Sequence, residues 1–312
     1  DYTARLKEIF KKYGTSGMFY AHASVGTLHV RPVLNMKSDK DIQNMRSISE
    51  EAFEMVKDYK GSHSGEHGDG IVRSEFHEMM FGKKITNAFE EIKDTFDSKN
   101  LLNPGKIVRP FKSNDRSLMR YKSGYQTENI DTHYDWSNWG QFSDAVEMCN
   151  NNGACRKLDS GVMCPSYRVT KEEKDLVRGR ANTLRLALSN QLPEGSFASK
   201  EMYETMELCV SCKACQRECP MSVDMAKMKS EFLSHYYKKF SMRIKDRVIS
   251  DMPRLIWLLK IVAPIFNKVK NLPLISTIVE KFGFATARSM PEVQNQNALR
   301  EIYDSQTVSE SK

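Results

Sequence analysis

The feature that most constrains this sequence is a run of four cysteines with the spacing C-x2-C-x2-C-x3-C-P, which extends from Cys209 to Pro220. Thiolates at three-residue intervals on one turn of backbone reach the same iron–sulfur cubane, and the proline after the last cysteine stops the chain from continuing as a helix. The spacing therefore predicts an iron–sulfur site, with a zinc knuckle or unliganded thiols as alternatives. In such runs the fourth cysteine usually binds a different cluster from the first three, so we expect further cysteine ligands elsewhere.

All cysteines of the chain fall in one stretch, and three of them precede the run: Cys149, Cys155 and Cys164. The total of seven is odd, which disfavours a secreted disulfide framework and suits metal binding in a reducing compartment. We therefore expect a cytoplasmic protein.

The upstream cysteines have the pattern of a second, incomplete run, in which Pro165 follows Cys164 and Asn152 stands where the middle cysteine would be. Crossing of ligands, as in two-cluster ferredoxins, assigns a complete [4Fe–4S] cluster to four residues: Cys164, Cys209, Cys212 and Cys215. The other three are Cys149, Cys155 and Cys219. They leave three alternatives open: a [3Fe–4S] cluster, a four-iron cluster with a non-cysteine ligand, or no cluster.

Composition limits the remaining possibilities. The net charge is +7, and the nine Lys or Arg and two Asp between Lys238 and Lys270 account for the same charge, so the rest of the chain is about neutral. A nucleic-acid-binding protein is therefore not expected. The segment is basic and amphipathic, and it either faces water or binds an acidic partner or an anionic membrane surface peripherally.

The longest apolar run, residues 255–266, contains Lys260 and Pro264 and is too short to span a bilayer.

With 312 residues, of which 40% are hydrophobic, the chain can form two domains. Its patterns predict an α+β domain with an antiparallel sheet, then a linker, an all-α helical ferredoxin domain, and a basic helical segment broken at its prolines with a disordered tail of about twenty residues. The four regions are 1–110, 111–140, 141–237 and 238–312. The chain begins without Met inside an expected helix, which suggests a fragment.

Two histidines in the first region are candidate metal ligands. His22 and His29 are seven residues apart, which puts them on opposite faces of a single continuous strand. However, Gly26 permits a hairpin whose turn is centred on Val25 and Gly26, and this makes the histidines cross-strand neighbours on one face.

The Gly-rich loop 62–70 supplies Glu66 and His67, and its glycines let the backbone approach a flat ligand closely. Two histidines and a glutamate form a catalytic metal set that leaves positions open for a substrate. Histidines satisfied within a core are the alternative.

These motifs resemble a known family. A-H-A-S-V-G-T-L-H, S-G-E-H-G-D-G and L-L-N-P-G-K, all within residues 1–110, are similar to the C-terminal, substrate-binding part of FAD-linked D-2-hydroxyacid dehydrogenases. This group of the vanillyl-alcohol-oxidase superfamily acts on D-lactate, glycolate or D-2-hydroxyglutarate. The resemblance implies that a divalent metal, usually zinc, binds to His22, His29 and Glu66, and that His67 is the general base. Expected flavin contacts are Gly68, Asp69, Gly70, Asn103 and Lys106. The family's FAD-binding half normally precedes this part, and we expect this chain to lack it.

The chain departs from the family's commoner G-H-x-G-D-G-N-x-H pattern. The sequence Ala-Ser-Val-Gly-Thr lies between its two histidines, His22 and His29. Arg31 stands where an Asn commonly follows the second histidine of the family pattern. Arg31 is therefore a candidate for clamping a substrate carboxylate bidentately.

The helical spacer between the cysteine motifs, with G-V-M-C-P-S-Y-R and V-R-G-R-A-N-T-L-R, resembles the α-helical ferredoxin domain of succinate dehydrogenase and glycolate oxidase iron–sulfur subunits. Arg178 and Arg180 either offset the charge of a cluster or face water, and we expect them to face water.

Together these resemblances imply flavin-dependent oxidation of a D-2-hydroxy acid to a 2-oxo acid. The acid chelates the metal, His67 takes the hydroxyl proton, and hydride passes to FAD. Electrons then leave singly through the [4Fe–4S] cluster to a quinone or a redox protein. The alternatives are a non-catalytic iron–sulfur electron-transfer subunit of an oxidoreductase complex and a structural metal protein.

Overall fold

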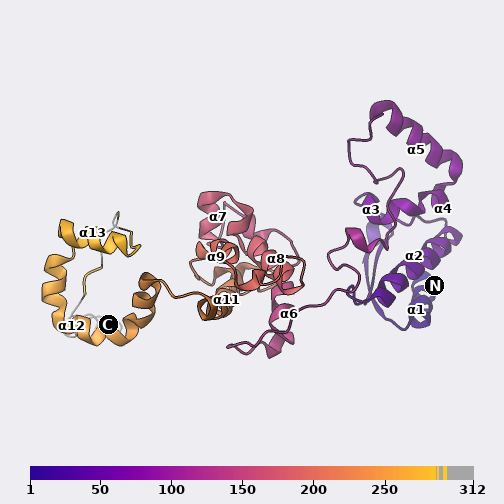
Figure 1. Cartoon of the computed structure of the whole chain (residues 1–312). Helices are drawn as coiled ribbons and strands as arrows, with labels where there is room; N and C mark the ends of the chain where they lie inside the picture. Colours follow the sequence, from indigo (N-terminus) through magenta and orange to yellow (C-terminus); the bar gives the residue numbers. More distant parts are fainter. Residues whose placement is uncertain (286, 288–290, 294–312) are drawn as a thin grey trace, which may run out of the picture. The chain divides into compact units, whose positions relative to one another are not determined.

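The computed structural model describes residues 1–285, 287 and 291–293, and Figure 1 traces the chain. The disordered tail predicted for about the last twenty residues lies outside the described residues. The chain divides into two compact units, Asp1–Thr127 and the part from Glu128 onward. This boundary falls within the segment 111–140 that the sequence predicts to be a linker.

The first unit combines helices with one small antiparallel sheet, as the sequence predicts. Its elements are α1 (Tyr2–Lys12), β1 (Gly17–His22), η1 (Ala23–Val25), β2 (Thr27–Pro32), α2 (Asp39–Asp58), α3 (Gly70–Arg73), η2 (Ser74–Phe76), α4 (His77–Phe81), α5 (Lys83–Phe96) and η3 (Arg116–Leu118).

Helix α1 packs against the hairpin of β1 and β2. Leu6 and Phe10 are four residues apart, so both lie on one face of the helix, where they are buried. The Phe10 ring stacks on Phe19 of β1 with ring centroids 5.8 Å apart. Gly17 lies so close to the Phe10 ring that a Cβ at this position would collide with it. One face of the hairpin is therefore covered, and the other face is left for the candidate site.

The hairpin register differs from the prediction in one respect. The expected turn would place His22 directly opposite His29, but the structure pairs His29 with Tyr20. The predicted turn is wrong because Ala23–Val25 form a 3-10 turn, which Gly26 closes in the left-handed region with φ +67°. Cross-strand partners share a face, and so do residues two apart along a strand. The two histidines are therefore diagonal neighbours on the same face.

Buried carboxylates hold the two ends of the segment 111–140. In the first unit, Glu75 accepts hydrogen bonds from Arg46 Nη1 at 2.9 Å and from the N–H of Ser113 at 2.6 Å. In the second unit, fully buried Glu231 accepts hydrogen bonds from Trp136 Nε1 and from two backbone N–H groups at 2.9 to 3.1 Å. Because these donors satisfy the buried charges, each end of the segment is anchored to its own unit.

The described part of the second unit contains helices and no strand. Its elements are η4 (Ser137–Trp139), α6 (Phe142–Glu147), η5 (Ala154–Arg156), α7 (Pro165–Thr170), η6 (Glu173–Asp175), α8 (Val177–Leu188), η7 (Ser196–Ala198), α9 (Lys200–Glu207), α10 (Ala214–Glu218), α11 (Met225–Lys239), α12 (Ile244–Val269) and α13 (Pro273–Lys281). Its core is lined by apolar side chains that include Leu184, Leu188, Met202, Met206, Met225 and Phe232. Cysteine loops are set between these helices.

Helix α12 continues through Pro253 and Pro264, so the predicted breaks at these residues are wrong. Each proline removes one hydrogen bond of the helix, and the helix follows a curved path instead of ending (Figure 1). Pro273 does mark a boundary, because it occupies the first turn of α13. No helix formed by the described residues is long and apolar enough to cross a membrane.

Candidate metal and iron–sulfur sites

The uncovered face of the hairpin carries two of the predicted metal ligands. The Nε2 atoms of His22 and His29 lie 3.1 Å apart. Their rings meet edge to face with centroids 4.9 Å apart. Both side chains remain open to solvent, so a small molecule can reach them.

The loop 62–70 brings Glu66 to this pair. Its Oε1 lies 2.9 Å from His29 Nε2, and its Oε2 lies 3.7 Å from His22 Nε2. The close approach of loop and strand depends on Gly65, where a Cβ would lie 3.0 Å from the Thr27 side chain of β2. A larger residue would push the loop away from the strand, and Glu66 would move with it.

The donor geometry fits a divalent metal ion. Tetrahedral zinc with donors at about 2.1 Å holds its ligand atoms about 3.4 Å apart. The separations of 2.9, 3.1 and 3.7 Å bracket this value. In addition, Glu66 Oε1 is buried and accepts no hydrogen bond of good geometry from the described residues. Such an orphaned oxygen is costly, and a cation would satisfy it. Two histidines and one carboxylate would leave coordination positions for a substrate.

His67 and Arg31 lie on the same side as these ligands. His67 Nε2 is 3.3 Å from Glu66 Oε1, and 86% of its side chain is exposed. Arg31 lies two residues beyond His29 on β2, hence on the same face of the hairpin. Its guanidinium carbon is 5.3 Å from the centroid of the Tyr20 ring. A group able to accept a proton and a cationic group able to bind an anion therefore accompany the three ligands.

Of the five predicted flavin contacts, Gly68, Asn103 and Lys106 lie in open loops and Gly70 is the first residue of α3. Gly68 and Gly70 have φ values of +73° and +58°, a region that glycine adopts without strain. Asn103 and Lys106 are exposed, with Lys106 Nζ 3.4 Å from Asn103 Oδ1. These residues present backbone and polar groups that are free to meet a ligand.

Asp69, the fifth predicted flavin contact, belongs to a second cluster that the sequence analysis missed. Its Oδ2 lies 2.7 Å from His77 Nε2, and its Oδ1 lies 3.9 Å from His63 Nε2. Burial is the main reason that the pKa of His63 is lowered from its ordinary value. His63 and His77 lie in no motif, and only the packing of the loop 62–70 against α4 brings them together.

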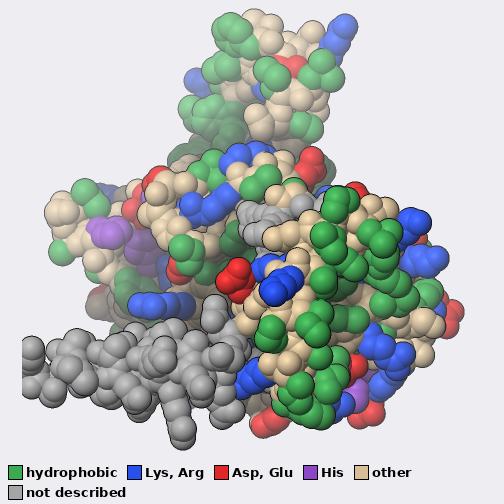
Figure 2. Space-filling view, turned by 90° about the vertical axis from the view of Figure 1, so that its left-hand side faces the viewer, with side chains coloured by type: hydrophobic (Ala, Val, Ile, Leu, Met, Phe, Trp, Pro, Cys, Tyr) green, Lys and Arg blue, Asp and Glu red, His purple; other side chains and the backbone are tan. Residues whose placement is uncertain are grey.

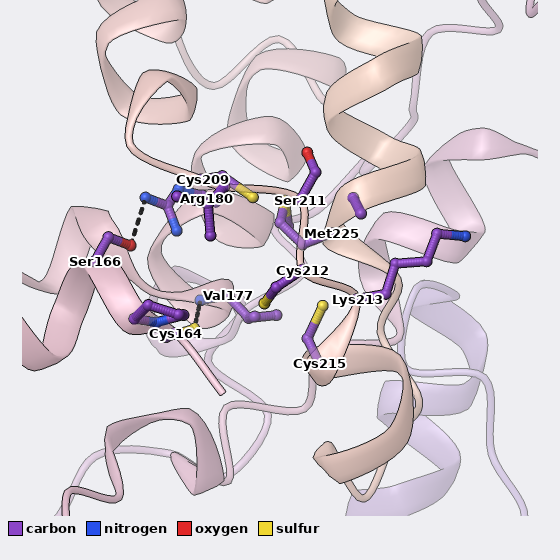
Figure 3. A pocket seen from close by; sticks show the side chains of 13 residues that line it. Cys164, Ser166, Val177, Arg180, Cys209, Ser211, Cys212, Lys213, Cys215 and Met225 are labelled. Atoms are coloured by element: carbon purple, nitrogen blue, oxygen red, sulfur yellow. Dashed lines mark hydrogen bonds between the residues drawn. The ribbon is translucent and has the colours of Figure 1, made fainter. Parts of the chain in front are cut away.

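The second unit contains a pocket lined by cysteines, which Figure 3 shows. The four cysteines in its lining are Cys164, Cys209, Cys212 and Cys215. Cys164 precedes α7 in a left-handed conformation with φ +55°, and its Sγ accepts a hydrogen bond from the N–H of Val177 at 3.3 Å. Burial raises the pKa of the Cys164 thiol to about 12. A thiolate at this position therefore needs the compensating charge of a metal.

The sulfurs of the described cysteines are not spaced for a single zinc ion. Among the described residues, no three cysteine sulfurs lie within 4.8 Å of one another. A single zinc ion with Zn–S bonds of about 2.3 Å would require sulfurs about 3.8 Å apart. A cubane binds its thiolates through different iron atoms and so holds them further apart.

The remaining cysteines differ in exposure: Cys149 and Cys155 are buried, whereas Cys219 is partly exposed. Asn152, which replaces a cysteine of the motif, accepts a hydrogen bond from the N–H of Ala154 at 2.8 Å. Its side-chain oxygen therefore stabilises the turn that precedes Cys155.

The expectation that Arg178 and Arg180 face water is wrong for Arg180. Its side chain is 2% exposed and lines the cysteine pocket (Figure 3). It donates to the backbone carbonyls of Asp175 at 2.7 Å and Thr205 at 2.9 Å. Arg178 pairs with Glu173 at 2.6 Å. The fixed charge of Arg180 beside the pocket would offset the negative charge of a thiolate-bound cluster.

Comparison with known proteins covers both units. Residues 1–107 match the family of FAD linked oxidases, C-terminal domain, and residues 145–223 match the 4Fe-4S dicluster domain. The D-2-hydroxyglutarate dehydrogenase of Pseudomonas putida is 30% identical over 316 residues, which cover 91% of this chain and 31% of that relative. The enzyme of the same name from Escherichia coli is 28% identical over 316 residues, 90% of this chain and 31% of the relative.

Other relatives match a smaller share of the chain. The glycolate oxidase subunit GlcD of Bacillus subtilis is 30% identical over 102 residues, 33% of this chain and 22% of the relative. No solved structure matches the chain. The chain spans about a third of the length of the D-2-hydroxyglutarate dehydrogenases that it matches.

Proposed function

We propose that this chain, in which the C-terminal domain of an FAD-linked oxidase is joined to a 4Fe-4S dicluster domain, is part of an FAD- and iron–sulfur-dependent D-2-hydroxyacid dehydrogenase. The first unit would bind and deprotonate the hydroxy acid. The second unit would carry the electrons away. The observation that carries the proposal is the convergence of His22, His29 and Glu66 on one point beside His67.

We assign the divalent metal to His22, His29 and Glu66, with zinc as the expected ion. When bound, the ion would lower the pKa of the substrate hydroxyl, and the flavin would accept the hydride from the substrate carbon. Nε2 of His67 would take the hydroxyl proton and release it to water, because most of its ring is exposed. Arg31 would hold the carboxylate through its guanidinium and so fix the orientation of the substrate.

The flavin contacts fall to Gly68, Gly70, Asn103 and Lys106. The glycine backbone lets a flat ring approach closely, whereas Asn103 and Lys106 offer polar side chains in an exposed loop. For Asp69 we retain a backbone contact only, since its carboxylate lies against His77.

Electron transfer would use a [4Fe–4S] cluster held by Cys164, Cys209, Cys212 and Cys215. A flavin that receives two electrons as hydride must release them singly to such a cluster, and a quinone or a redox protein would be the final acceptor. Cys149, Cys155 and Cys219 would be the ligands of a second cluster, of the [3Fe–4S] type or with a non-cysteine ligand. The name of the matched domain, a dicluster domain, supports a second cluster.

D-2-hydroxyglutarate is the first substrate to test, because the relatives that match about nine-tenths of the chain carry its name. It has a second carboxylate, which gives a cationic residue such as Arg31 a further partner. A non-catalytic electron-transfer subunit is less well supported, since a docking surface has no need for three convergent metal ligands and a neighbouring base.

The test is a dye-reduction screen of the complete enzyme against matched D- and L-2-hydroxy acids. We expect D-2-hydroxyglutarate to reduce the dye fastest and the L-isomers to be inactive. Failure of every hydroxy acid, with flavin and clusters bound, would reject the proposed function.

Helix α12 is the proposed contact with an anionic membrane surface. Exposed apolar residues recur every three or four positions along it: Ile244, Val248, Met252, Leu255, Leu258 and Val262. Exposed Arg247, Arg254 and Lys268 accompany this stripe. Figure 2 shows hydrophobic and basic side chains interspersed on the surface toward the viewer. Such a helix lies at the lipid headgroups without spanning the bilayer.

A further inference from the structure

Three titratable side chains converge in the first unit, separately from the ligands proposed above. His63, Asp69 and His77 each offer one ligand atom, and these atoms all lie within 4.8 Å of one another. His63 and His77 are buried, and Asp69 is partly buried. None of the three belongs to the set of His22, His29 and Glu66. The cluster therefore needs an explanation of its own.

His63 is the first reason to look for a ligand. Its side chain is 0% exposed, and neither ring nitrogen has a hydrogen-bond partner among the described residues. Asp69 Oδ1 lies 3.9 Å from Nε2, beyond hydrogen-bonding distance, and the backbone of Arg73 is a further polar neighbour of the ring. Burying an imidazole with both nitrogens unsatisfied costs free energy, because the ring gives up its hydrogen bonds to water without replacing them. A cation between His63 and Asp69 would satisfy both side chains.

His77 is the second reason. Its Nδ1 lies 3.2 Å from the carbonyl oxygen of Ile107, so Nδ1 must carry a proton and donate it there. The other nitrogen, Nε2, faces Asp69 Oδ2 at 2.7 Å. Without a metal, a second proton has to lie between Nε2 and Asp69 Oδ2 for these atoms to approach so closely. With a metal, the neutral tautomer suffices. A metal-binding histidine typically donates its second N–H to a carbonyl or carboxylate in this way.

Aromatic rings cover the two histidines, whereas Ser64 and Arg73 are polar neighbours of the cluster. Phe53 and Phe81 pack on the His63 ring with centroids 5.2 and 5.9 Å away, and Phe89 packs on the His77 ring at 6.2 Å. The two histidine rings are 5.6 Å apart, nearly perpendicular. Such a wall keeps water away and strengthens the attraction between Asp69 and a cation.

We propose that His63, Asp69 and His77 bind a second divalent transition-metal ion of the zinc type. The two Asp69 oxygens differ in their distances, with Oδ2 2.7 Å from His77 Nε2 and Oδ1 3.9 Å from His63 Nε2. These values lie on either side of the spacing of about 3.4 Å between ligand atoms of tetrahedral zinc. Two imidazoles and one carboxylate suit zinc better than magnesium or calcium, which prefer oxygen ligands. The ion would tie the loop 62–70, and hence Glu66 and His67, to α4. Its role is positional, and it does not depend on the proposed dehydrogenase activity.

Metal analysis of the whole chain tests this site without any activity assay. The chain would be purified anaerobically with its iron–sulfur clusters, equilibrated with Zn²⁺, desalted, and analysed for zinc per chain. We expect His63→Leu and His77→Leu each to lose about one zinc ion relative to the unmodified chain. The double substitution His22→Ala and His29→Ala should remove a different zinc ion, so the two losses should add. Zinc bound to stray cysteines is the same in all variants and cancels in the comparison.

Two controls keep the outcome decisive. His133→Leu changes an exposed histidine outside both clusters and should leave the zinc content unchanged.

Thermal unfolding separates metal loss from misfolding. With a chelator, His63→Leu should be at least as stable as the unmodified chain, because leucine removes two unsatisfied nitrogens. With Zn²⁺, the unmodified chain and His133→Leu should gain stability from this site, whereas His63→Leu should not. A His63→Leu chain that is folded and retains all its zinc would overturn the proposal, and the pair of Asp69 with protonated His77 would then account for the cluster.

Discussion

The two candidate sites of this chain differ most in their access to solvent. His22, His29 and His67 lie on an open hairpin face and an exposed loop, whereas the cysteine site combines buried Cys164, Cys215 and Arg180 with exposed Cys212. A site that binds a substrate has to admit it and release its product. A site that only passes electrons works best when protein excludes water from it. The open hairpin site and the largely buried cysteine site fit the roles that we propose for them, substrate oxidation in the first unit and electron transfer in the second.

The largest effect is expected from His67→Ala in the complete enzyme. Loss of the base should lower turnover of the hydroxy acid between about 10² and 10⁴ fold. Zinc and iron contents should not change, because His67 is not among the proposed ligands. Steady-state kinetics and metal analysis on the same sample check both points. Unchanged turnover would show that another group accepts the proton.

Arg31→Met should mainly weaken substrate binding. A lost charge-assisted bidentate contact is expected to raise KM by about 10 to 100 fold, with a smaller change in kcat. Arg31→Lys keeps the positive charge but lacks the planar guanidinium group. Its KM should fall between those of the unmodified enzyme and Arg31→Met. Equal KM values for all three enzymes would mean that Arg31 does not touch the carboxylate.

Gly65→Ala tests whether the close approach of the loop 62–70 to β2 positions Glu66 for metal binding. The added methyl group would meet Thr27 and displace Glu66, which should weaken zinc binding at the hairpin about tenfold. Thr27→Ala removes both atoms that the methyl group would meet at 3.0 Å, so the double variant should recover most of the affinity. Zinc titration with a chelating indicator measures the zinc affinity of each variant. If the double variant binds as weakly as Gly65→Ala, the close approach of loop and strand is not the cause.

The smallest effect concerns α12. Replacing one exposed cation, Arg247→Gln, should weaken binding to phosphatidylserine vesicles about fivefold, since each basic residue at such a surface contributes about 1 kcal/mol. Lys84→Gln on α5 is the matched control and should have no effect. Vesicle sedimentation measures both. Equal binding of all three chains would leave α12 as a helix that simply faces water.

The sequence predicted the parts of these sites that lie in short motifs. A local hairpin is enough to predict that His22 and His29 are neighbours, whereas the family resemblance adds Glu66 to them. The structure brings the ligand atoms of all three within 4.8 Å of one another. The exact pairing was missed, since nothing in Ala23–Val25 distinguishes a 3-10 turn from a tight β-turn. The small antiparallel sheet among helices was also predicted and is confirmed.

What the sequence did not predict depends on tertiary packing. His63 and His77 meet only because α4 folds back onto the loop 62–70, and Arg180 is buried only because its guanidinium finds carbonyl acceptors on η6 and α9. Similarly, Pro253 and Pro264 suggest breaks, yet α12 tolerates the lost hydrogen bonds by bending. Local propensity carries no information on such compensation.

We propose that the first unit oxidises the substrate and that the second transfers the electrons. Rapid-mixing spectroscopy of the complete enzyme with Cys212→Ala tests this assignment most directly. This substitution removes a proposed ligand of the [4Fe–4S] cluster and leaves the hairpin site untouched. We expect D-2-hydroxyglutarate to bleach the flavin at the rate of the unmodified enzyme, while the EPR signal of the reduced four-iron cluster and the reduction of the acceptor are lost. Loss of flavin bleaching, or a persistent four-iron signal, would show that oxidation and electron export are not separated as we propose.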